Sequence, residues 1–307
     1  MSVNTQDINN KTLIVITGPT GIGKSATAID LAQRLSTEII SADSRQVYKG
    51  IPIITAAPTE EERSIVPHHL VDFLELDEYY SASLFEQQAL SLLDQIFRRS
   101  DYAVVCGGSM MYVDALCNGI DELPTIPDNI RQQLMQEHAD NGNDWLLQRL
   151  EQLDPVYYNQ VDRQNTKRVF HAVEICLASG RPYSSLRTGT RRSRPFRIIK
   201  TALTADRQLI FDRINLRVEK MLEMGMLDEA RSVYHLRHLN SLNTVGFKEM
   251  FRYLDGEWDL PTAIARMQKN TRVYAKKQMT WYQRDPLIHW IDASAQVTPT
   301  EQILALL

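Results

Sequence analysis

One short stretch restricts the possible folds of this chain more than any other. Residues 18–25 read GPTGIGKS, which fits the G-x-x-x-x-G-K-S pattern of a phosphate-binding loop. Residues 12–17 (TLIVIT) are apolar and β-branched, as in a buried strand, and residues 25–35 have the spacing of an amphipathic helix. A strand, a glycine-rich loop and a helix in this order are the context in which such a loop binds phosphate.

The same alternation of strand and helix continues along the chain. A second strand is predicted at 37–42 and a helix at 83–99, followed by a third strand at 102–106 and another helix. This pattern predicts an α/β fold, a P-loop-containing parallel sheet flanked by helices. Functional residues of such sheets gather beyond the carboxyl ends of the strands. We therefore expect Asp43 and Ser109 to lie beside the phosphate loop.

The pattern changes after about residue 120. Prolines punctuate a helical stretch that runs to about residue 179, and a loop at 179–195 leads to a returning strand at 196–203. The remainder is predicted as helices at 206–236, 246–254 and 259–283. We predict a P-loop core in two parts, 1–120 and 191–307, the second with C-terminal helices, interrupted by an all-helical insertion domain at 121–190.

The net charge of −4 hides an asymmetry in this chain of 307 residues. Between Arg163 and Lys220 there are 14 lysines and arginines against four acids, so this segment carries +10 and the rest −14. Segregated charge favours a basic face for a polyanion on an acidic body. The alternative is a solvated basic helix and loop that bind nothing.

Composition also bears on the compartment. The three cysteines form no C-x-x-C pair, which predicts reduced thiols without a disulfide or a zinc site. No window approaches 18 uncharged apolar residues, and residues 1–11 are polar, which predicts a frayed tail rather than a signal peptide. We expect a cytoplasmic protein without membrane contact, and a monomer.

The loop residues suggest their own chemistry. Backbone N–H groups and Lys24 would bind phosphate oxygens, and Ser25 could ligate Mg²⁺, as in enzymes that use ATP or GTP. Such enzymes usually carry a magnesium-binding acid at the end of a neighbouring strand. Here the strand at 102–106 ends in Gly107, Gly108 and Ser109 instead. This weakens the ordinary NTPase interpretation without excluding a small kinase.

Three other polar residues allow more than one interpretation. Asp43 ends the second strand and could be a magnesium ligand, a general base or a helix N-cap. His68 and His69 are adjacent, which is a poor arrangement for a metal pair. We predict loop histidines that form hydrogen bonds.

A set of further motifs follows the loop in a fixed order. They are SADSRQVYKGIPIITAAPT (41–59), PHHLVD (67–72), YSASLF (80–85), VCGGSMMYVDAL (105–116), LDPVYY (153–158), NTVGFKEM (243–250) and KKQMTWYQRD (276–285). Together with the loop, they make the chain resemble the tRNA dimethylallyltransferases, also called tRNA isopentenyltransferases, over residues 12–292.

The resemblance implies a different chemistry from that of a kinase. In that family the loop, with Mg²⁺ as cofactor, binds the diphosphate of dimethylallyl diphosphate. The N6 atom of adenosine 37 in a tRNA anticodon loop with adenosines at positions 36 and 37 attacks the allylic carbon, and diphosphate leaves. Alternatives are a P-loop small-molecule kinase, a prenyltransferase for free adenine nucleotides, or a nucleic-acid-binding module that has lost catalysis.

The resemblance also implies roles for individual residues. Asp43 would be the general base, and Thr20, Ser109 and Arg217 would complete the catalytic group. The diphosphate-binding residues would be Gly18, Pro19, Thr20, Gly21, Ile22, Gly23, Lys24 and Ser25, with Ser25 as the metal ligand. The tRNA-binding residues would be Asp43, Ser44, Arg45, Gln46, Ser109, Arg131, Lys167, Arg168, His171, Thr244, Val245, Gly246, Phe247, Lys248, Glu249, Lys276, Lys277 and Gln278. Lys167 and His171 replace the Gln and Arg that flank Arg168 in the family pattern.

Overall fold

The computed structural model describes residues 11–121, 123–189 and 191–307. The tail predicted at 1–11 lies almost entirely outside the described residues. The chain divides into two compact units, which we call the core unit (Met1–Cys117 and Ser193–Leu307) and the insertion unit (Asn118–Arg192). The sequence had placed the insertion at 121–190.

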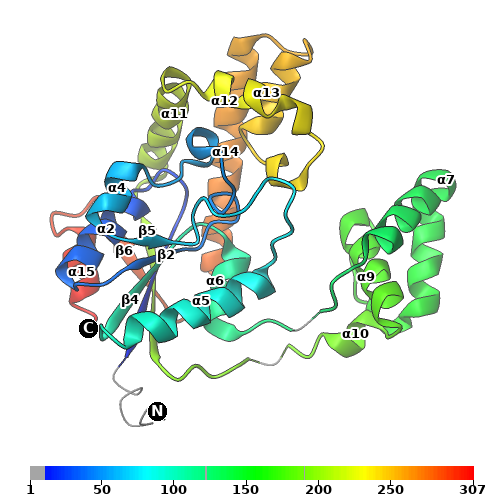
Figure 1. The fold of residues 1–307 in the computed structure, drawn as a ribbon, viewed down its shortest axis with the longest axis horizontal. Coiled ribbons are helices and arrows are strands. Elements are labelled where there is room, and N and C mark those ends of the chain that lie inside the picture. Colours follow the sequence, from blue (N-terminus) through cyan, green and yellow to red (C-terminus); the bar gives the residue numbers. More distant parts are fainter. Residues whose placement is uncertain (1–10, 122, 190) are drawn as a thin grey trace. The chain divides into compact units, whose positions relative to one another are not determined.

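The core unit is built on one six-stranded sheet in the order β3-β2-β4-β1-β5-β6, in which every pair is parallel (Figure 1). This confirms the predicted fold class. The strands are β1 (Thr12–Thr17), β2 (Ile39–Ser41), β3 (His68–His69), β4 (Tyr102–Cys106), β5 (Arg197–Thr204) and β6 (Ile288–Asp292). The two edge strands, β3 and β6, were not predicted.

The helices of the core unit agree with the predicted pattern, with additional short elements. They are α2 (Lys24–Arg34), α3 (Pro52–Thr55), α4 (Glu60–Ile65), α5 (Ala82–Phe97), α6 (Met110–Asn118), α11 (Arg207–Glu223), α12 (Met226–Ser232), α13 (Phe247–Leu254), α14 (Leu260–Tyr282) and α15 (Pro299–Leu304), with 3₁₀ turns η1 (Tyr234–Leu236) and η2 (Asn240–Leu242). The stretch predicted as helical at 206–236 is divided at Gly225, whose φ is 97°. No helix in the described part of the chain combines the length and the apolar character needed to cross a membrane.

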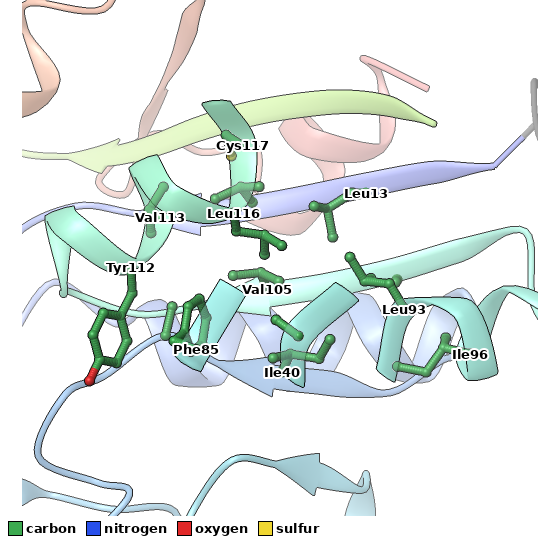
Figure 2. Packing of buried hydrophobic residues seen from close by; sticks show 14 of the residues in the cluster. Leu13, Ile40, Phe85, Leu93, Ile96, Val105, Tyr112, Val113, Leu116 and Cys117 are labelled. Carbon is green, nitrogen blue, oxygen red and sulfur yellow. The ribbon is translucent and has the colours of Figure 1, made fainter. Parts of the chain in front are cut away.

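Alternation along the strands explains the layers. Leu13 and Val15 of β1 point to one face, where they pack against α5 and α6, as Figure 2 shows for Leu13. Ile14 and Ile16 point to the other face, against α2, α11 and α15. Because both faces of the sheet are covered, its strands are apolar on both sides. A fully buried side chain of this size contributes about 1.5–3 kcal/mol.

A third apolar cluster lies beyond the sheet and is made by helices. Val218 and Met221 of α11 pack with Phe247 of α13 and Met267 of α14, and Ile54 of α3 joins them. This cluster holds the helices that follow β5 against the segment that follows β2.

The insertion unit is helical, with its own core. Its helices are α7 (Asp128–Leu153), α8 (Pro155–Tyr158), α9 (Thr166–Ser179) and α10 (Tyr183–Leu186). Gly142, with φ 79°, interrupts α7 and divides it into two helical segments. Leu134, Leu150 and Val173 are at the centre of the core. The loop predicted at 179–195 contains the short helix α10, so that prediction was incomplete.

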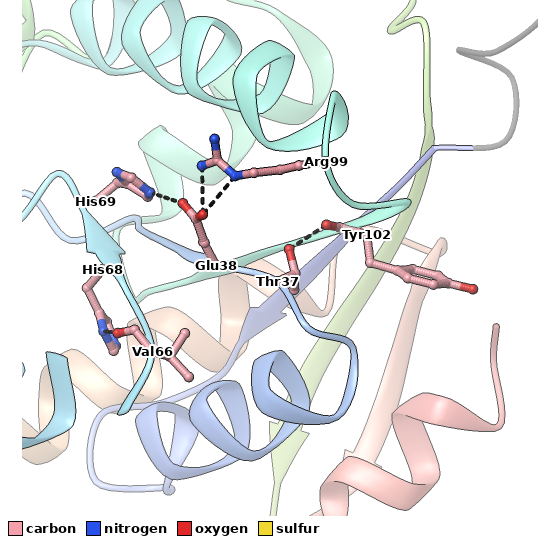
Figure 3. A network of polar contacts seen from close by, with 7 residues as sticks. All are labelled: Thr37, Glu38, Val66, His68, His69, Arg99 and Tyr102. Atoms are coloured by element: carbon pink, nitrogen blue, oxygen red, sulfur yellow. Dashed lines mark hydrogen bonds and ion pairs between the residues drawn. The ribbon is translucent and has the colours of Figure 1, made fainter. Parts of the chain in front are cut away.

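The amino end of the sheet carries a network of paired polar groups (Figure 3). Glu38 accepts hydrogen bonds from Arg99 and contacts His69 Nε2 at 2.6 Å. His68 Nδ1 lies 2.8 Å from the carbonyl oxygen of Val66. Both histidines form hydrogen bonds as predicted, but they lie in the short strand β3 rather than in a loop.

Candidate active site

The phosphate loop joins β1 to α2 at the carboxyl edge of the sheet. Gly23, with φ 104°, is the N-cap of α2 and has no side chain to cap the helix. Among the described residues, no protein group accepts a hydrogen bond from the backbone N–H groups of Gly21 through Lys24. Unpaired amides at a helix N-terminus attract an anion, which is the arrangement predicted for this loop.

A cavity of about 380 Å³, here called the phosphate cavity, lies over this loop. Besides loop residues, it is lined by Arg213 and Arg217 of α11 and by the segment Cys106 to Gly108 after β4. Arg213 Nη1 donates to the carbonyl of Ile22 at 3.3 Å, and Arg217 Nη1 lies 3.5 Å from the Thr20 hydroxyl. Three cations, counting Lys24, therefore border a space beside unpaired amides, which suits a polyphosphate.

Lys24 is half-buried, and only neutral groups accept its hydrogen bonds. Its Nζ donates to the carbonyls of Gly18 at 3.0 Å and Pro19 at 2.9 Å. Burial lowers the pKa of Lys24 from 10.5 to about 8; Arg217 also lowers it, whereas Cys106 and Asp43 act in the opposite direction. A bound anion would restore the charge of Lys24, because an opposite charge favours the protonated form.

Asp43 lies at the end of β2 and both caps a turn and faces the cavities. Its Oδ1 accepts hydrogen bonds from the backbone N–H groups of Arg45 at 2.9 Å and Gln46 at 3.4 Å. Within the described residues, nothing donates to Oδ2. The capping role and the role of a base, which the sequence left as alternatives, are therefore compatible in one side chain.

A second cavity of about 420 Å³ adjoins the first and is here called the apolar-walled cavity. Its apolar wall consists of Ile54, Ile214, Val218, Met221, Val245 and Met267. Its polar wall includes Ser44, Arg45, Ser109, Thr244 and Lys248. The residues that line both cavities are Thr20, Asp43, Thr55, Arg217 and Tyr274. An anion and an organic group could therefore lie next to each other with Asp43 between them.

Two buried carboxylates fix the walls of the apolar-walled cavity. The carboxylate of Glu229 in α12 accepts hydrogen bonds from the backbone N–H groups of Ile53 at 2.7 Å and Ile54 at 2.8 Å. Glu249 accepts the N–H of Gly246 at 2.7 Å and the side-chain amide of Asn270 at 2.7 Å. At Gly246, φ is 101° and a Cβ atom would lie 2.5 Å from Ile54, so the close approach of these walls requires glycine.

Gln278 and Tyr274 of α14 connect the loop to the strand end after β4. The side-chain oxygen of Gln278 accepts a hydrogen bond from the backbone N–H of Thr20 at 3.0 Å. Its side-chain nitrogen donates to the carbonyl of Gly108 at 3.0 Å. Tyr274 donates to the same carbonyl at 3.2 Å and lines both cavities. Sequence analysis missed Tyr274; its spacing of four residues from Gln278, which places both on one helix face, could have indicated it.

The donor set fits a magnesium ion held mainly by phosphate and water. Ser25 is exposed at the phosphate cavity and offers a hydroxyl oxygen. Over the described ranges, no three or more His, Cys, Asp or Glu side chains cluster in a way that could hold a metal alone. Mg²⁺ is commonly bound by one or two protein oxygens together with substrate phosphates, so the residues fit.

Comparison with known proteins agrees with this geometry. The IPP transferase family profile matches residues 46–285. The chain is 53% identical to tRNA dimethylallyltransferase 1 of Bacteroides thetaiotaomicron over 91% of each chain, and 43% identical to the tRNA dimethylallyltransferase of Christiangramia forsetii over 91% of this chain and 93% of the other.

The chain belongs to the tRNA dimethylallyltransferase family. Solved structures agree. A tRNA isopentenylpyrophosphate transferase from Bacillus halodurans has a TM-score of 0.68 at 34% identity and covers 97% of this chain and 94% of its own. A eukaryotic dimethylallyltransferase acting on tRNA has a TM-score of 0.77 at 29% identity, covering 92% of this chain and 74% of its own.

The family resemblance implied eight diphosphate-binding residues, and not all of them face the phosphate cavity. Thr20, Gly21, Gly23, Lys24 and Ser25 line it. Gly18 and Pro19 contribute carbonyls to Lys24, and the side chain of Ile22 is buried in the core.

The predicted tRNA-binding residues of the core unit divide into two groups. Asp43, Ser44, Arg45, Ser109, Thr244, Val245 and Lys248 line the apolar-walled cavity, Gln46 lines the phosphate cavity, and Lys276 and Lys277 are exposed on α14. Gly246, Phe247, Glu249 and Gln278 are buried. Glu249 accepts hydrogen bonds from Gly246 and Asn270, and Gln278 forms hydrogen bonds with Thr20 and Gly108. Of these four, Gln278 also lines the phosphate cavity. Contact of the four residues with tRNA stays a prediction.

In the insertion unit, the predicted tRNA-binding residues lie on α7 and α9. Lys167, Arg168 and His171 are exposed along one side of α9. Arg131 of α7 donates to Glu174 at 2.7 Å, and His171 lies 3.7 Å from the same carboxylate. Burial opposes ionisation of Glu174, but the contacts with His171 and Arg131 prevail and hold its pKa below the ordinary value.

Proposed function

We propose that this enzyme transfers the dimethylallyl group from dimethylallyl diphosphate to N6 of adenosine 37 in the anticodon loop of tRNA, releasing diphosphate. The observation that carries the proposal is the junction of the two cavities. A cationic, amide-lined cavity meets a partly apolar cavity at Thr20, Asp43 and Arg217. Membership of the tRNA dimethylallyltransferase family supports the same activity.

The reaction follows from what lies on each side of this junction. The adenine N6 forms a bond to the allylic carbon while the bond from that carbon to the diphosphate oxygen breaks. The N6 proton passes to the carboxylate of Asp43, whose Oδ2 accepts no hydrogen bond among the described residues. A positioned carboxylate can act as a general base here because the proton becomes acidic as the new bond forms.

The leaving diphosphate gains negative charge as its bond to carbon breaks. The amides of Gly21 through Lys24, with the cations of Lys24 and Arg217, stabilise that charge without moving far, because the loop and α11 already hold them around the cavity. When bound at Ser25, Mg²⁺ would neutralise further charge on the diphosphate. No phosphoryl transfer is involved, which is consistent with a strand end of glycines after β4.

Recognition of tRNA would use both units. An enzyme that alkylates a base extrudes that base into a pocket, and Thr244, Val245 and Lys248 border such a pocket here. The exposed Lys167 and Arg168 in the insertion unit are suited to phosphate contacts. The segment with 14 basic residues against four acids would then belong to the tRNA-binding surface.

The proposal can be tested with radiolabelled dimethylallyl diphosphate, Mg²⁺ and an unmodified tRNA anticodon stem-loop. Label should enter the wild-type stem-loop and should not enter a matched stem-loop that carries guanosine at position 37. Faster labelling of free AMP would favour the adenine-nucleotide prenyltransferase. Transfer of the γ-phosphate of ATP in place of the prenyl group would favour the kinase.

A further inference from the structure

The glycines after β4 leave the phosphate cavity without the acid that a P-loop site usually has there. The structure supplies a carboxylate from another element. Glu62 of α4 lines the phosphate cavity together with Lys24 and Ser25. Asp43 and Glu62 are the two carboxylates among the residues that line this cavity. Glu62 was not among the predicted site residues.

The side chain of Glu62 is held in a defined direction by a capping box. Its Oε2 accepts the backbone N–H of Thr59 at 2.9 Å, and its own N–H donates to the Thr59 hydroxyl at 3.1 Å. Within the described residues, no group pairs with Oε1. One oxygen therefore fixes the side chain at the end of α4, and the other is available to a ligand.

Electrostatics indicates what kind of ligand this is. A carboxylate beside a diphosphate repels it unless a cation lies between the two. Asp43 has Lys24 and Arg217 nearby to compensate its charge, and both respond to it electrostatically. Glu62 has no lysine or arginine partner in the described part of the chain. Mg²⁺ is often held by a carboxylate together with phosphate oxygens, so a divalent cation would resolve the repulsion.

We propose that Glu62 supplies the carboxylate of the magnesium site, so that Mg²⁺ is held among Glu62, the Ser25 hydroxyl and the bound diphosphate. Glu62 would thus replace the acid that is absent after β4. The inference rests on the proposed function only in taking diphosphate as the ligand of this cavity.

Calorimetry of inorganic diphosphate binding to the full chain, with Mg²⁺ and separately with EDTA, tests the proposal. Glu62→Gln keeps the capping box, because glutamine serves at this position too. Its diphosphate affinity should fall about tenfold in Mg²⁺, as expected when a carboxylate that supports a metal site is removed. In EDTA the variant should bind diphosphate at least as tightly as wild type, because a repulsive charge has been removed.

Glu61→Gln is the matched control, since Glu61 is an exposed glutamate on the same turn of α4 that lines neither cavity. It should leave both affinities unchanged. A Glu62→Gln variant that binds as tightly as wild type in Mg²⁺, or that weakens equally in EDTA, would overturn the proposal. Titration of free Mn²⁺ by electron paramagnetic resonance gives an independent readout: the variant should retain less Mn²⁺ in the presence of diphosphate.

The two proposals can fail separately. If labelled dimethylallyl groups never enter tRNA but Glu62→Gln shows opposite effects in Mg²⁺ and EDTA, the proposed function fails and the magnesium assignment stands. If transfer to tRNA occurs but the variant shows no such reversal, the assignment of Glu62 fails alone.

Discussion

The two ends of the parallel sheet differ in how their charged side chains are paired. At the amino end, charged side chains pair with one another: Lys11 lies 2.8 Å from Asp101, and Glu38 lies 2.6 Å from both His69 and Arg99. These contacts satisfy the charges within the protein, so this end of the sheet offers little to a charged ligand.

At the carboxyl end, four cations that line the cavities contact neutral groups. Lys24 and Arg213 donate to backbone carbonyls, Arg45 donates to the carbonyls of Asn240 and Ser241, and Arg217 approaches a threonine hydroxyl. None of these four cations lies within ion-pair distance of a carboxylate in the described residues. Charged side chains thus form ion pairs at the amino end of the sheet, whereas these four cations at the carboxyl end remain available to bind an anion. Substitutions at the two ends should therefore affect different properties.

The largest effect is expected at Asp43. Asp43→Asn should lower the single-turnover rate of dimethylallyl transfer about a thousandfold, because asparagine cannot take the N6 proton. The melting temperature should not change, because the asparagine oxygen can still accept the N–H groups of Arg45 and Gln46. Asp43→Ala should lower both the rate and the melting temperature, since it also removes the turn cap, which is worth about 1 kcal/mol. A nearly wild-type rate for Asp43→Asn would show that Asp43 only caps the turn and is not the general base.

An intermediate effect is expected at Lys24. Lys24→Ala should weaken diphosphate binding by about ten- to a hundredfold, the range for losing a hydrogen bond from a charged group. Because the pKa of Lys24 is lowered to about 8, the side chain of the free protein is protonated below that pH and loses its charge above it. Wild-type affinity should therefore fall as pH rises through this value.

Lys24→Arg provides the control for the pH dependence. Arginine remains charged throughout, so the affinity of this variant should stay level between about pH 7 and 9.5. Calorimetric titration with diphosphate across this range makes the comparison. An equal decline in both proteins would assign the pH dependence to another group.

The smallest effect is expected at the amino end and should concern stability alone. Glu38→Gln should lower the free energy of unfolding by about 1 kcal/mol and leave prenyl transfer unchanged. Partial burial raises the pKa of Glu38, but the hydrogen bonds from His69 and Arg99 prevail and hold it below the ordinary value. The stabilisation is therefore present above the unfolded pKa of about 4.5 and is lost as pH falls through the folded value.

Urea unfolding at neutral and at acidic pH measures this difference. Asp94→Asn serves as the matched control, because Asp94 pairs with Arg98 on an exposed helix surface at 67% side-chain exposure for both. It should change the unfolding free energy very little at either pH. A loss of prenyl transfer in Glu38→Gln would contradict the distinction between the two ends.

The local pattern of apolar and polar residues was sufficient to predict helices and strands that depend on contacts between residues close in sequence. The β-branched run before the loop became β1, and the amphipathic stretch after it became α2, because strand and helix periodicities are read within one element. The rule that parallel strands share a carboxyl edge placed Asp43 and Ser109 beside the loop. The short edge strands β3 and β6 carry too few residues for such a pattern, and they were missed.

The sequence by itself determined the phosphate loop, the parallel sheet around it and, through ordered motifs, the family. Only the tertiary structure decided which side chains face a ligand. Gln278 contacts Thr20 across 258 residues, so its burial between the loop and Gly108 could not be read from the spacing of basic residues on α14. The same holds for Glu62, which enters the phosphate cavity from α4, a helix that none of the sequence motifs includes. Burial depends on which distant elements pack together, and that is a property of the whole fold.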